Sequence, residues 1–190
     1  LDLGTGTGRL PLLFGDQVQS LIGLDLHGDM LRAHQLQCQQ VKGAWHLTQG
    51  DMRTLPIPTQ WADVVTAGWA IGHLTGWYPA DWQRQIGQVV DEMHRVVRKP
   101  GYLLIFETLT TGSLTPAPPN EILSHYYNWL EEQHGFTRQI IQTDYQFSTV
   151  EQAITHTEFF FGAELAKLIR DNGWVRLPEW TGLWWKQVTP

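Results

Sequence analysis

The sequence opens with an acid followed by a glycine-rich turn, DLGTGTG at residues 2–8. The order of residue types predicts a buried strand that runs into a turn and then into a helix. Glycines at such a turn allow positive φ angles and let a ligand lie directly against the backbone. The dinucleotide fingerprint G-x-G-x-x-G would require a third glycine at the position that Arg9 occupies. A plain tight turn remains the alternative interpretation.

Two further acids follow the next two apolar runs. Asp25 ends the run at residues 20–25, where an acidic side chain can accept hydrogen bonds from both hydroxyls of a ribose. Gly50, Asp51 and Met52 follow the run at residues 44–48. Gly-Asp is also a common turn pair, so this second acid is informative only together with the others.

The segment from Gly68 to His73 follows the fourth apolar run, residues 62–67. Because ligands bind outside the carboxyl ends of strands in open α/β sheets, this segment is expected to face the crevice. His73 is the candidate general base there, since a hydroxyl or protonated amine that attacks an electrophile must lose a proton. The alternative is that its ring only bonds to the loop backbone.

These residues need a sheet to position them, and the first half of the chain predicts one. Short apolar runs alternate with helical patterns, which is typical of βαβ units and a parallel sheet. The clearest helix is expected over residues 81–98, where apolar side chains at steps of three, four and seven form one stripe. Those side chains are Trp82, Ile86, Val89, Val90, Met93, Val96 and Val97. Residues 99–101 should stop this helix before a buried strand over residues 102–106.

The pattern in the second half of the chain predicts fewer βαβ units. A proline-containing loop over residues 110–120 precedes a helix at 121–133 and a strand at 136–147. Residues 149–171 are expected to be helical with a break at Gly162. A last strand at residues 175–187 should be irregular at Pro178.

Taken together, the motifs resemble those of the class I S-adenosylmethionine-dependent methyltransferases, in the small-molecule branch with type 11/25-like domains. The segment VVRKPG at residues 96–101 is similar to the L-K-P-G-G block of that family, with Tyr102 in place of the second glycine. The resemblance covers residues 1–107. It implies an α/β, Rossmann-like three-layer sandwich with a mostly parallel seven-stranded sheet and a reversed strand near its C-terminal edge.

The resemblance also implies S-adenosyl-L-methionine as the cofactor. The glycine loop would pass its methionine part, Asp25 would bind the ribose, and the Gly-Asp pair would receive the adenine. The cofactor-binding residues expected on this basis are Asp2, Gly4, Thr5, Gly6, Gly8, Asp25, Leu26, Asp51, Met52, Gly68 and Trp69.

Aromatic residues suggest where an acceptor would bind. Segment 108–135 is expected to be a substrate lid inserted into the domain. The residues expected to contact the acceptor are Trp77, Tyr78, Tyr126 and Trp129. Such rings could hold a planar or cationic acceptor. The alternative is that they pack one helix onto the domain.

Bulk composition limits the remaining possibilities. The net charge of −6 gives no general attraction to nucleic acids or anionic membranes, and 42% hydrophobic residues indicate a globular chain. The single cysteine, Cys38, excludes an internal disulfide or a cysteine-based metal site, and suits a cytoplasmic protein. No metal is expected. We expect one methyltransferase domain over residues 1–190, truncated at its N-terminus because Leu1 lies within a strand pattern.

The function expected is therefore methyl transfer from S-adenosylmethionine to an unidentified small-molecule acceptor. Three other functions stay open at this point. They are a non-catalytic module that binds S-adenosylmethionine, a nicotinamide-dependent reductase on a similar sheet, and a different S-adenosylmethionine-using transferase on this fold. The residue at position 9 and the Gly-Asp pair after the third strand disfavour the reductase.

Overall fold

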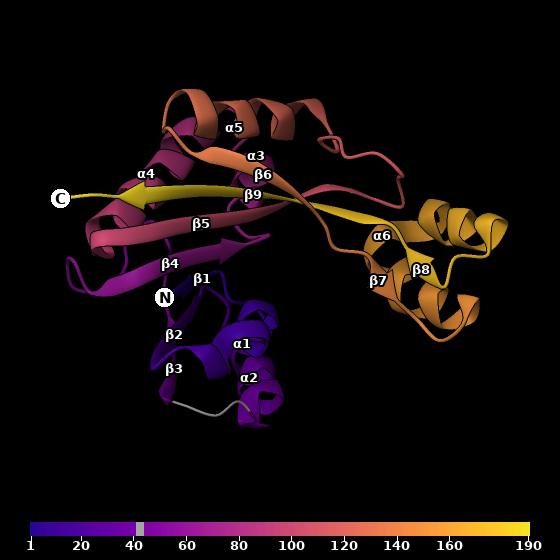
Figure 1. Ribbon diagram of the computed structural model, residues 1–190, viewed down its shortest axis with the longest axis horizontal. Helices are drawn as coiled ribbons and strands as arrows, with labels where there is room; N and C mark the ends of the chain where they lie inside the picture. Colours follow the sequence, from indigo (N-terminus) through magenta and orange to yellow (C-terminus); the bar gives the residue numbers. More distant parts are fainter. Residues whose placement is uncertain (41–43) are drawn as a thin grey trace.

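The computed structural model describes residues 1–40 and 44–190. Its strands and helices follow the alternation that the sequence predicts, and Figure 1 shows their arrangement. Two short 3₁₀ segments, Gly15–Gln17 and Cys38–Gln40, supplement them. In chain order the elements are β1 (Asp2–Leu3), α1 (Arg9–Phe14), β2 (Ser20–Asp25), α2 (Gly28–Gln37), β3 (Ala44–Gln49), β4 (Ala62–Gly68), α3 (His73–Trp77), α4 (Trp82–Val96), β5 (Val97–Thr111), α5 (Glu121–Glu132), β6 (Thr137–Gln142), β7 (Tyr145–Gln146), α6 (Val150–Asn172), β8 (Arg176–Leu177) and β9 (Glu179–Val188).

The main sheet has seven strands in the order β3-β2-β1-β4-β5-β9-β6. Strands β1 to β5 pair in parallel, whereas β9 is antiparallel to both β5 and β6. The predicted fold class is thereby confirmed, including the reversed strand next to the C-terminal edge. Asp2 pairs with Gly23 of β2 and with Thr66 of β4, so these strands end at one common edge.

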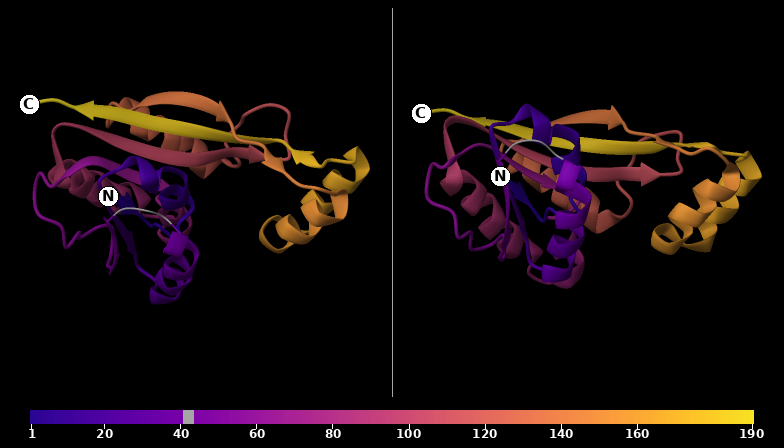
Figure 2. Two further views of the ribbon diagram at one scale, coloured as in Figure 1. Left: turned by 60° about the horizontal axis from the view of Figure 1, so that its bottom comes forward. Right: turned by 90° about the horizontal axis from the view of Figure 1, so that it is seen from below.

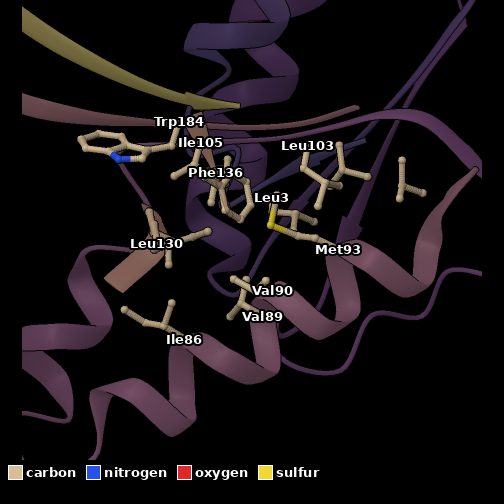
Figure 3. Close-up of a cluster of buried hydrophobic side chains, with 14 of the residues drawn as sticks. Leu3, Ile86, Val89, Val90, Met93, Leu103, Ile105, Leu130, Phe136 and Trp184 are labelled. Carbon is tan, nitrogen blue, oxygen red and sulfur yellow. The ribbon is translucent and has the colours of Figure 1, made fainter. Parts of the chain in front are cut away.

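Helix α4 covers one face of this sheet with the stripe that the sequence predicts. Its fully buried side chains include Ile86, Val89, Val90 and Met93. Figure 3 shows them beneath Leu3, Leu103 and Ile105 of the sheet, beside Leu130, Phe136 and Trp184. Each large apolar side chain buried in this way contributes about 1.5–3 kcal/mol to stability.

The junction between α4 and β5 differs from the prediction. The helix ends at Val96 and β5 begins at Val97, whereas the sequence pattern suggested a helix to residue 98 and a strand from residue 102. Strand pairing explains the difference, because Val97 pairs with Ala62 ahead of a register shift. A Cβ added at Gly101 would lie 2.6 Å from the Arg98 carbonyl oxygen and 2.9 Å from that of Asp63, so only glycine fits.

The residues between β6 and β9 form a small unit beyond the carboxyl end of β5, as Figures 1 and 2 show. Helix α6 packs its buried residues Ala153, Leu165 and Ile169 with Leu177 in a second, separate core. Strand β7 lies between β6 and α6, and β8 lies between α6 and β9. The two strands pair with each other and so join the two ends of this unit. The predicted break in the helix is present at Gly162, whose φ of 79° and ψ of 178° are not helical.

Segment 108–135, the predicted lid, contains the end of β5 and all of α5. Asn120 caps α5 by accepting a hydrogen bond from the Leu123 amide at 2.9 Å. Leu109, Tyr127 and Leu130 are buried in the main core. The helix is thus packed onto the domain, and a covering role for an acceptor stays a prediction. Within the described residues, no helix has the length and apolar character to cross a membrane.

Candidate functional site

The glycine loop between β1 and α1 uses its glycines in different ways. Gly4, Gly6 and Gly8 all have left-handed backbone angles, with φ of 61°, 53° and 97°. A Cβ added at Gly4 would overlap the Ala70 side chain, whereas one added at Gly6 would find only the Gly4 carbonyl oxygen, at 4.0 Å. The loop is therefore packed at Gly4 and open at Gly6, where a ligand can lie against the backbone.

A buried carboxyl group supports this loop from beneath. The hydroxyls of Thr5 and Thr66 donate to the two oxygens of Asp2 at 2.7 and 2.6 Å. Burial raises the pKa of Asp2 to about 6, and the two hydroxyls oppose that rise. These contacts show how Asp2 and Thr5 shape the loop, and their direct contact with a cofactor stays a prediction.

His34 of α2 lies fully buried on the other side of the loop. Its Nδ1 atom is 3.5 Å from the Thr5 hydroxyl, and its Nε2 atom has no partner among the described residues. Burial lowers the pKa of His34, which favours the neutral ring. A Cβ added at Gly8 would lie 2.9 Å from this ring, so the close approach of α2 explains the third glycine.

Asp25, the last residue of β2, points at the open part of the loop. Its two oxygens accept hydrogen bonds from the backbone amides of Gly6, at 2.8 Å, and of His27, at 2.9 Å. A carboxylate has about four lone-pair positions, so each oxygen keeps capacity for one more donor. The carboxylate is held in a fixed orientation from which it can accept two hydroxyl groups. Leu26, the next residue, is 45% exposed.

Asp51, after β3, is engaged by a residue that the motif does not include. The Arg53 guanidinium donates to both oxygens of Asp51 and, at 2.5 Å, to Gln85 of α4. The Arg53 side chain holds the pKa of Asp51 below its usual range. Met52 lies between them in the chain and packs against the main core. The spacing of an arginine two residues after an acid could have suggested this pair.

The turn after β4 is fixed by two contacts with β5. Trp69 has a φ of 51°, its amide donates to the Phe106 carbonyl at 2.7 Å, and its ring stacks on that of Phe106. The Gly72 amide donates to the Glu107 carboxyl at 2.8 Å. Burial raises the pKa of Glu107 to about 7, although the Gly72 amide lowers it in part. The backbone at Gly68 packs closely against the Leu10 side chain, since a Cβ added at Gly68 would lie 2.8 Å from it.

His73 begins the short helix α3 and is exposed at this edge of the sheet. Its ring stacks on Trp77, which is 55% exposed, with 5.7 Å between ring centres. Tyr78 is half-buried and faces Arg53, whose guanidinium carbon lies 5.2 Å from the centre of the tyrosine ring. Geometry thus leaves the His73 ring accessible, and its role as a base stays a prediction.

The other two aromatic residues suggested as acceptor contacts lie on α5. Tyr126 is fully buried, and its hydroxyl donates to Glu107 at 3.4 Å. Trp129 is half-buried and packs edge-on against Trp82. These contacts make Tyr126 part of the core that supports the turn after β4. In the ranges 1–40 and 44–190, no cluster of three or more His, Cys, Asp or Glu side chains could hold a metal ion.

Comparisons with known proteins bear on the family and the fold. A family model described as "Methyltransferase domain" matches residues 1–105. The chain is 32% identical over 114 residues to the malonyl-[acyl-carrier protein] O-methyltransferase of Pseudescherichia vulneris, covering 60% of this chain and 40% of that protein. The corresponding protein of Yersinia pestis is 34% identical over 115 residues, covering 60% of this chain and 38% of the relative.

The chain therefore spans about two fifths of the length of these curated relatives. Among solved structures, YcgJ from Bacillus subtilis superposes with a TM-score of 0.59 at 20% identity, covering 100% of this chain and 91% of YcgJ. That likeness concerns the fold alone. The family match extends over more than half of the sequence and includes the glycine loop and the acids after β2 and β3. The chain belongs to the class I S-adenosylmethionine-dependent methyltransferases.

Proposed function

We propose that this protein transfers a methyl group from S-adenosylmethionine to a small-molecule acceptor bound at the carboxyl edge of the sheet. The single observation that carries the proposal is the geometry of Asp25 and Gly6. A buried carboxylate, oriented by two backbone amides, adjoins a glycine whose outer face is open. This combination suits a ligand with a pair of hydroxyl groups and a part that lies flat along the backbone.

The residues around the loop fit the rest of that ligand. The open face of Gly6 would take the methionine part, and Asp25 would accept the two ribose hydroxyls. Asp51 and the Met52 amide would meet the adenine ring. Asp2, Thr5 and His34 would act from beneath by holding the loop.

Bound S-adenosylmethionine would supply a methyl group on a positively charged sulfur, already activated for in-line displacement. The chain has to orient the acceptor and accept its proton. His73 is the candidate proton acceptor because it is exposed and begins the helix beyond the turn after β4. Trp69 and Gly68 would form the wall between cofactor and acceptor, since contacts with Phe106 and Leu10 fix their positions.

Calorimetric titration with S-adenosylmethionine and S-adenosylhomocysteine tests the proposal. We expect micromolar binding of both, no binding of NADH, and at least about tenfold weaker binding by Asp25→Asn, because hydrogen bonds to a charged group are replaced by weaker ones. Asp63→Asn is the matched control, since Asp63 is exposed and pairs with Arg98 at the opposite edge of the sheet.

Three results would contradict the proposal in different ways. Binding of NADH in place of the sulfur ligands would favour the reductase. Binding of the sulfur ligands without turnover of any acceptor would favour a non-catalytic module. Equal weakening by Asp25→Asn and Asp63→Asn would remove Asp25 from the site.

The named relatives provide a second candidate acceptor, a carboxylic acid carried on an acyl carrier protein. Sequence identity of 32–34% to two malonyl-[acyl-carrier protein] O-methyltransferases supports it. Incubation with malonyl-acyl carrier protein and methyl-labelled S-adenosylmethionine should then give a labelled, base-labile ester on the carrier. Absence of label under conditions that methylate a free small acid would favour the small-molecule acceptor.

We also propose a cytoplasmic location and no nucleic-acid or membrane partner. The single cysteine is a buried free thiol, and the net charge is −6. A role for segment 108–135 in covering the acceptor belongs to the same proposal.

A further inference from the structure

Arg9, the first residue of α1, holds its guanidinium against aromatic rings instead of a carboxylate. Its guanidinium carbon lies 3.9 Å from the centre of the Trp69 ring and 5.6 Å from that of Tyr145. Among the described residues, the guanidinium has no ion pair or hydrogen bond, and the side chain is exposed. Its planar set of N–H donors is thus oriented by stacking and available for an anionic partner.

Glu179, the first residue of β9, is a buried carboxyl group on the same side of the molecule. The residue is 2% exposed, and within residues 1–40 and 44–190 its Oε2 atom has no hydrogen-bond partner. Its backbone is fixed, because its amide donates to Asp144 at 3.1 Å and its carbonyl accepts from the Thr143 amide at 2.8 Å. A buried polar atom without a partner is rare in folded proteins, so this oxygen has the capacity to accept a hydrogen bond from a ligand.

The two groups are coupled electrostatically. Burial raises the pKa of Glu179, and Asp144 raises it further. The hydroxyls of Thr111 and Thr108 and the charge of Arg9 lower the pKa of Glu179. Asp144 is itself paired with Arg176 at 2.6 Å. Among the described residues, Arg9 thus acts on Glu179 as a cation that has no ion-pair partner of its own.

These residues converge at the edge of the sheet where the cofactor site lies. Glu179 pairs with Thr111 at the carboxyl end of β5. Tyr145 belongs to β7, which Figure 1 shows beyond that end, and Trp69 follows β4. Arg9 directly follows the glycine loop. Four segments far apart in the sequence thus bring a free cation, two rings and an unsatisfied carboxyl oxygen together.

We propose that Arg9, Trp69, Tyr145 and Glu179 form the acceptor subsite, and that it takes a small organic acid bearing a hydroxyl or amino group. Arg9 binds the carboxylate through two parallel hydrogen bonds, and the rings flank the body of the molecule. The free oxygen of Glu179 accepts a hydrogen bond from the hydroxyl or amino group. The inference deepens the proposed function and rests on it for the position of the cofactor.

Titration of simple acids tests the subsite without knowledge of the natural acceptor. The probes are 2-, 3- and 4-hydroxybenzoate, which vary the separation of carboxylate and hydroxyl, with the corresponding hydroxybenzamides and benzoate as comparisons. Binding to the full chain saturated with S-adenosylhomocysteine is followed by ligand-observed NMR. At least one hydroxybenzoate should bind about tenfold more tightly than its amide, and more tightly than benzoate.

Variants assign the two preferences to the two charged residues. Arg9→Gln should abolish the preference for acid over amide, and Arg9→Lys should restore only part of it because lysine lacks the planar fork. Glu179→Gln, which keeps the side-chain volume, should abolish the preference for hydroxybenzoate over benzoate. Arg98→Gln is the matched control, since Arg98 is exposed at the opposite edge and pairs with Asp63.

The outcomes separate the subsite from the proposed function. If S-adenosylhomocysteine binds to wild type and to Arg9→Gln alike, but acids and amides bind equally or not at all, the subsite is refuted and the cofactor site stands. If acids bind with Arg9 dependence while S-adenosylhomocysteine does not bind, the proposed function fails. Equal effects of Arg9→Gln and Arg98→Gln would also overturn the subsite, because only a nonspecific charge effect would remain.

Discussion

The Arg53 guanidinium donates three hydrogen bonds of 2.6 to 3.1 Å to the carboxylate of Asp51. The Arg53 amide adds a fourth at 2.9 Å, so every lone-pair position of this carboxylate is engaged. The family's motif assigns Asp51 to the adenine amine, which must therefore compete with a guanidinium two residues away.

Replacing this guanidinium should strengthen cofactor binding. In Arg53→Met the carboxylate of Asp51 is released to the adenine amine, and we expect the Kd of S-adenosylhomocysteine to fall by about threefold to tenfold, the equivalent of one net hydrogen bond. Calorimetry measures it, with Arg84→Met as control because that arginine pairs with Asp81 on the surface. Weaker binding by a fully folded Arg53→Met would mean that Arg53 orients Asp51 instead of competing for it.

His73 should matter for turnover and not for cofactor binding. His73→Gln removes the proton acceptor. We expect kcat, measured with an acceptor that the wild-type protein methylates, to fall by about a hundredfold or more. The affinity for S-adenosylhomocysteine should stay within about twofold. His125→Gln, an exposed histidine on α5, is the control. An unchanged kcat would exclude His73 as the base.

Glu107 should make stability depend on pH. Its pKa rises from 4.5 to about 7 on folding, chiefly through burial. Between these values the folded chain binds more protons than the unfolded chain, so the stability that Glu107 contributes at low pH is lost as the pH rises from about 4.5 to 7. The integrated loss is about 3 kcal/mol at 1.36 kcal/mol per pH unit.

Glu107→Gln should remove this part of the pH dependence. Urea unfolding at pH 5, 6, 7 and 8 gives the difference in unfolding free energy between wild type and variant at each pH. That difference should shift in favour of the variant as the pH rises. The exposed residue Glu132, changed to Gln, provides the control. A constant difference across the series would mean that Glu107 titrates alike in both states.

Gly162 should be required for the bend in α6. Its φ of 79° with ψ of 178° is a backbone region that side chains avoid, although no atom lies within 4 Å of an added Cβ. Gly162→Ala should therefore cost about 1–3 kcal/mol through backbone strain alone. Gly87→Ala in α4 is the matched control, because its added Cβ also meets no atom but its backbone is helical, and it should stabilise by up to about 1 kcal/mol. Equal thermal shifts in the two variants would contradict the strain.

Local patterns allowed much of the fold to be predicted. The stripe from Trp82 to Val96 specifies both a helix and its buried face, and Gly162 marks the interruption of α6. Strand β5 was predicted too short because its ends are set by partners far away in sequence. Val97 belongs to this strand because it pairs with Ala62, and Thr111 belongs to it because it pairs with Glu179.

The site could be predicted only where a motif is continuous in sequence. Gly4, Gly6 and Asp25 belong to spacings that carry a mechanism, and the open face of Gly6 follows from the same turn. The meeting of Arg9 with Tyr145 and Glu179 depends on sheet order and on the position of β7, which no local pattern encodes. Tyr126, whose aromatic character suggested an acceptor contact, is fully buried and donates to Glu107, and its contact with an acceptor stays a prediction.

The separate core of α6 has an evolutionary consequence. Residues 143–178 leave the main sheet after β6 and return to it at β9, and four of their apolar side chains, Ala153, Leu165, Ile169 and Leu177, are buried in a core of their own. Selection can rewrite such a unit without disturbing the strands that hold Asp25 and the glycine loop. Grafting this segment between relatives should therefore leave their affinity for the methyl donor intact, while it changes the part of the proposed acceptor subsite that Tyr145 supplies.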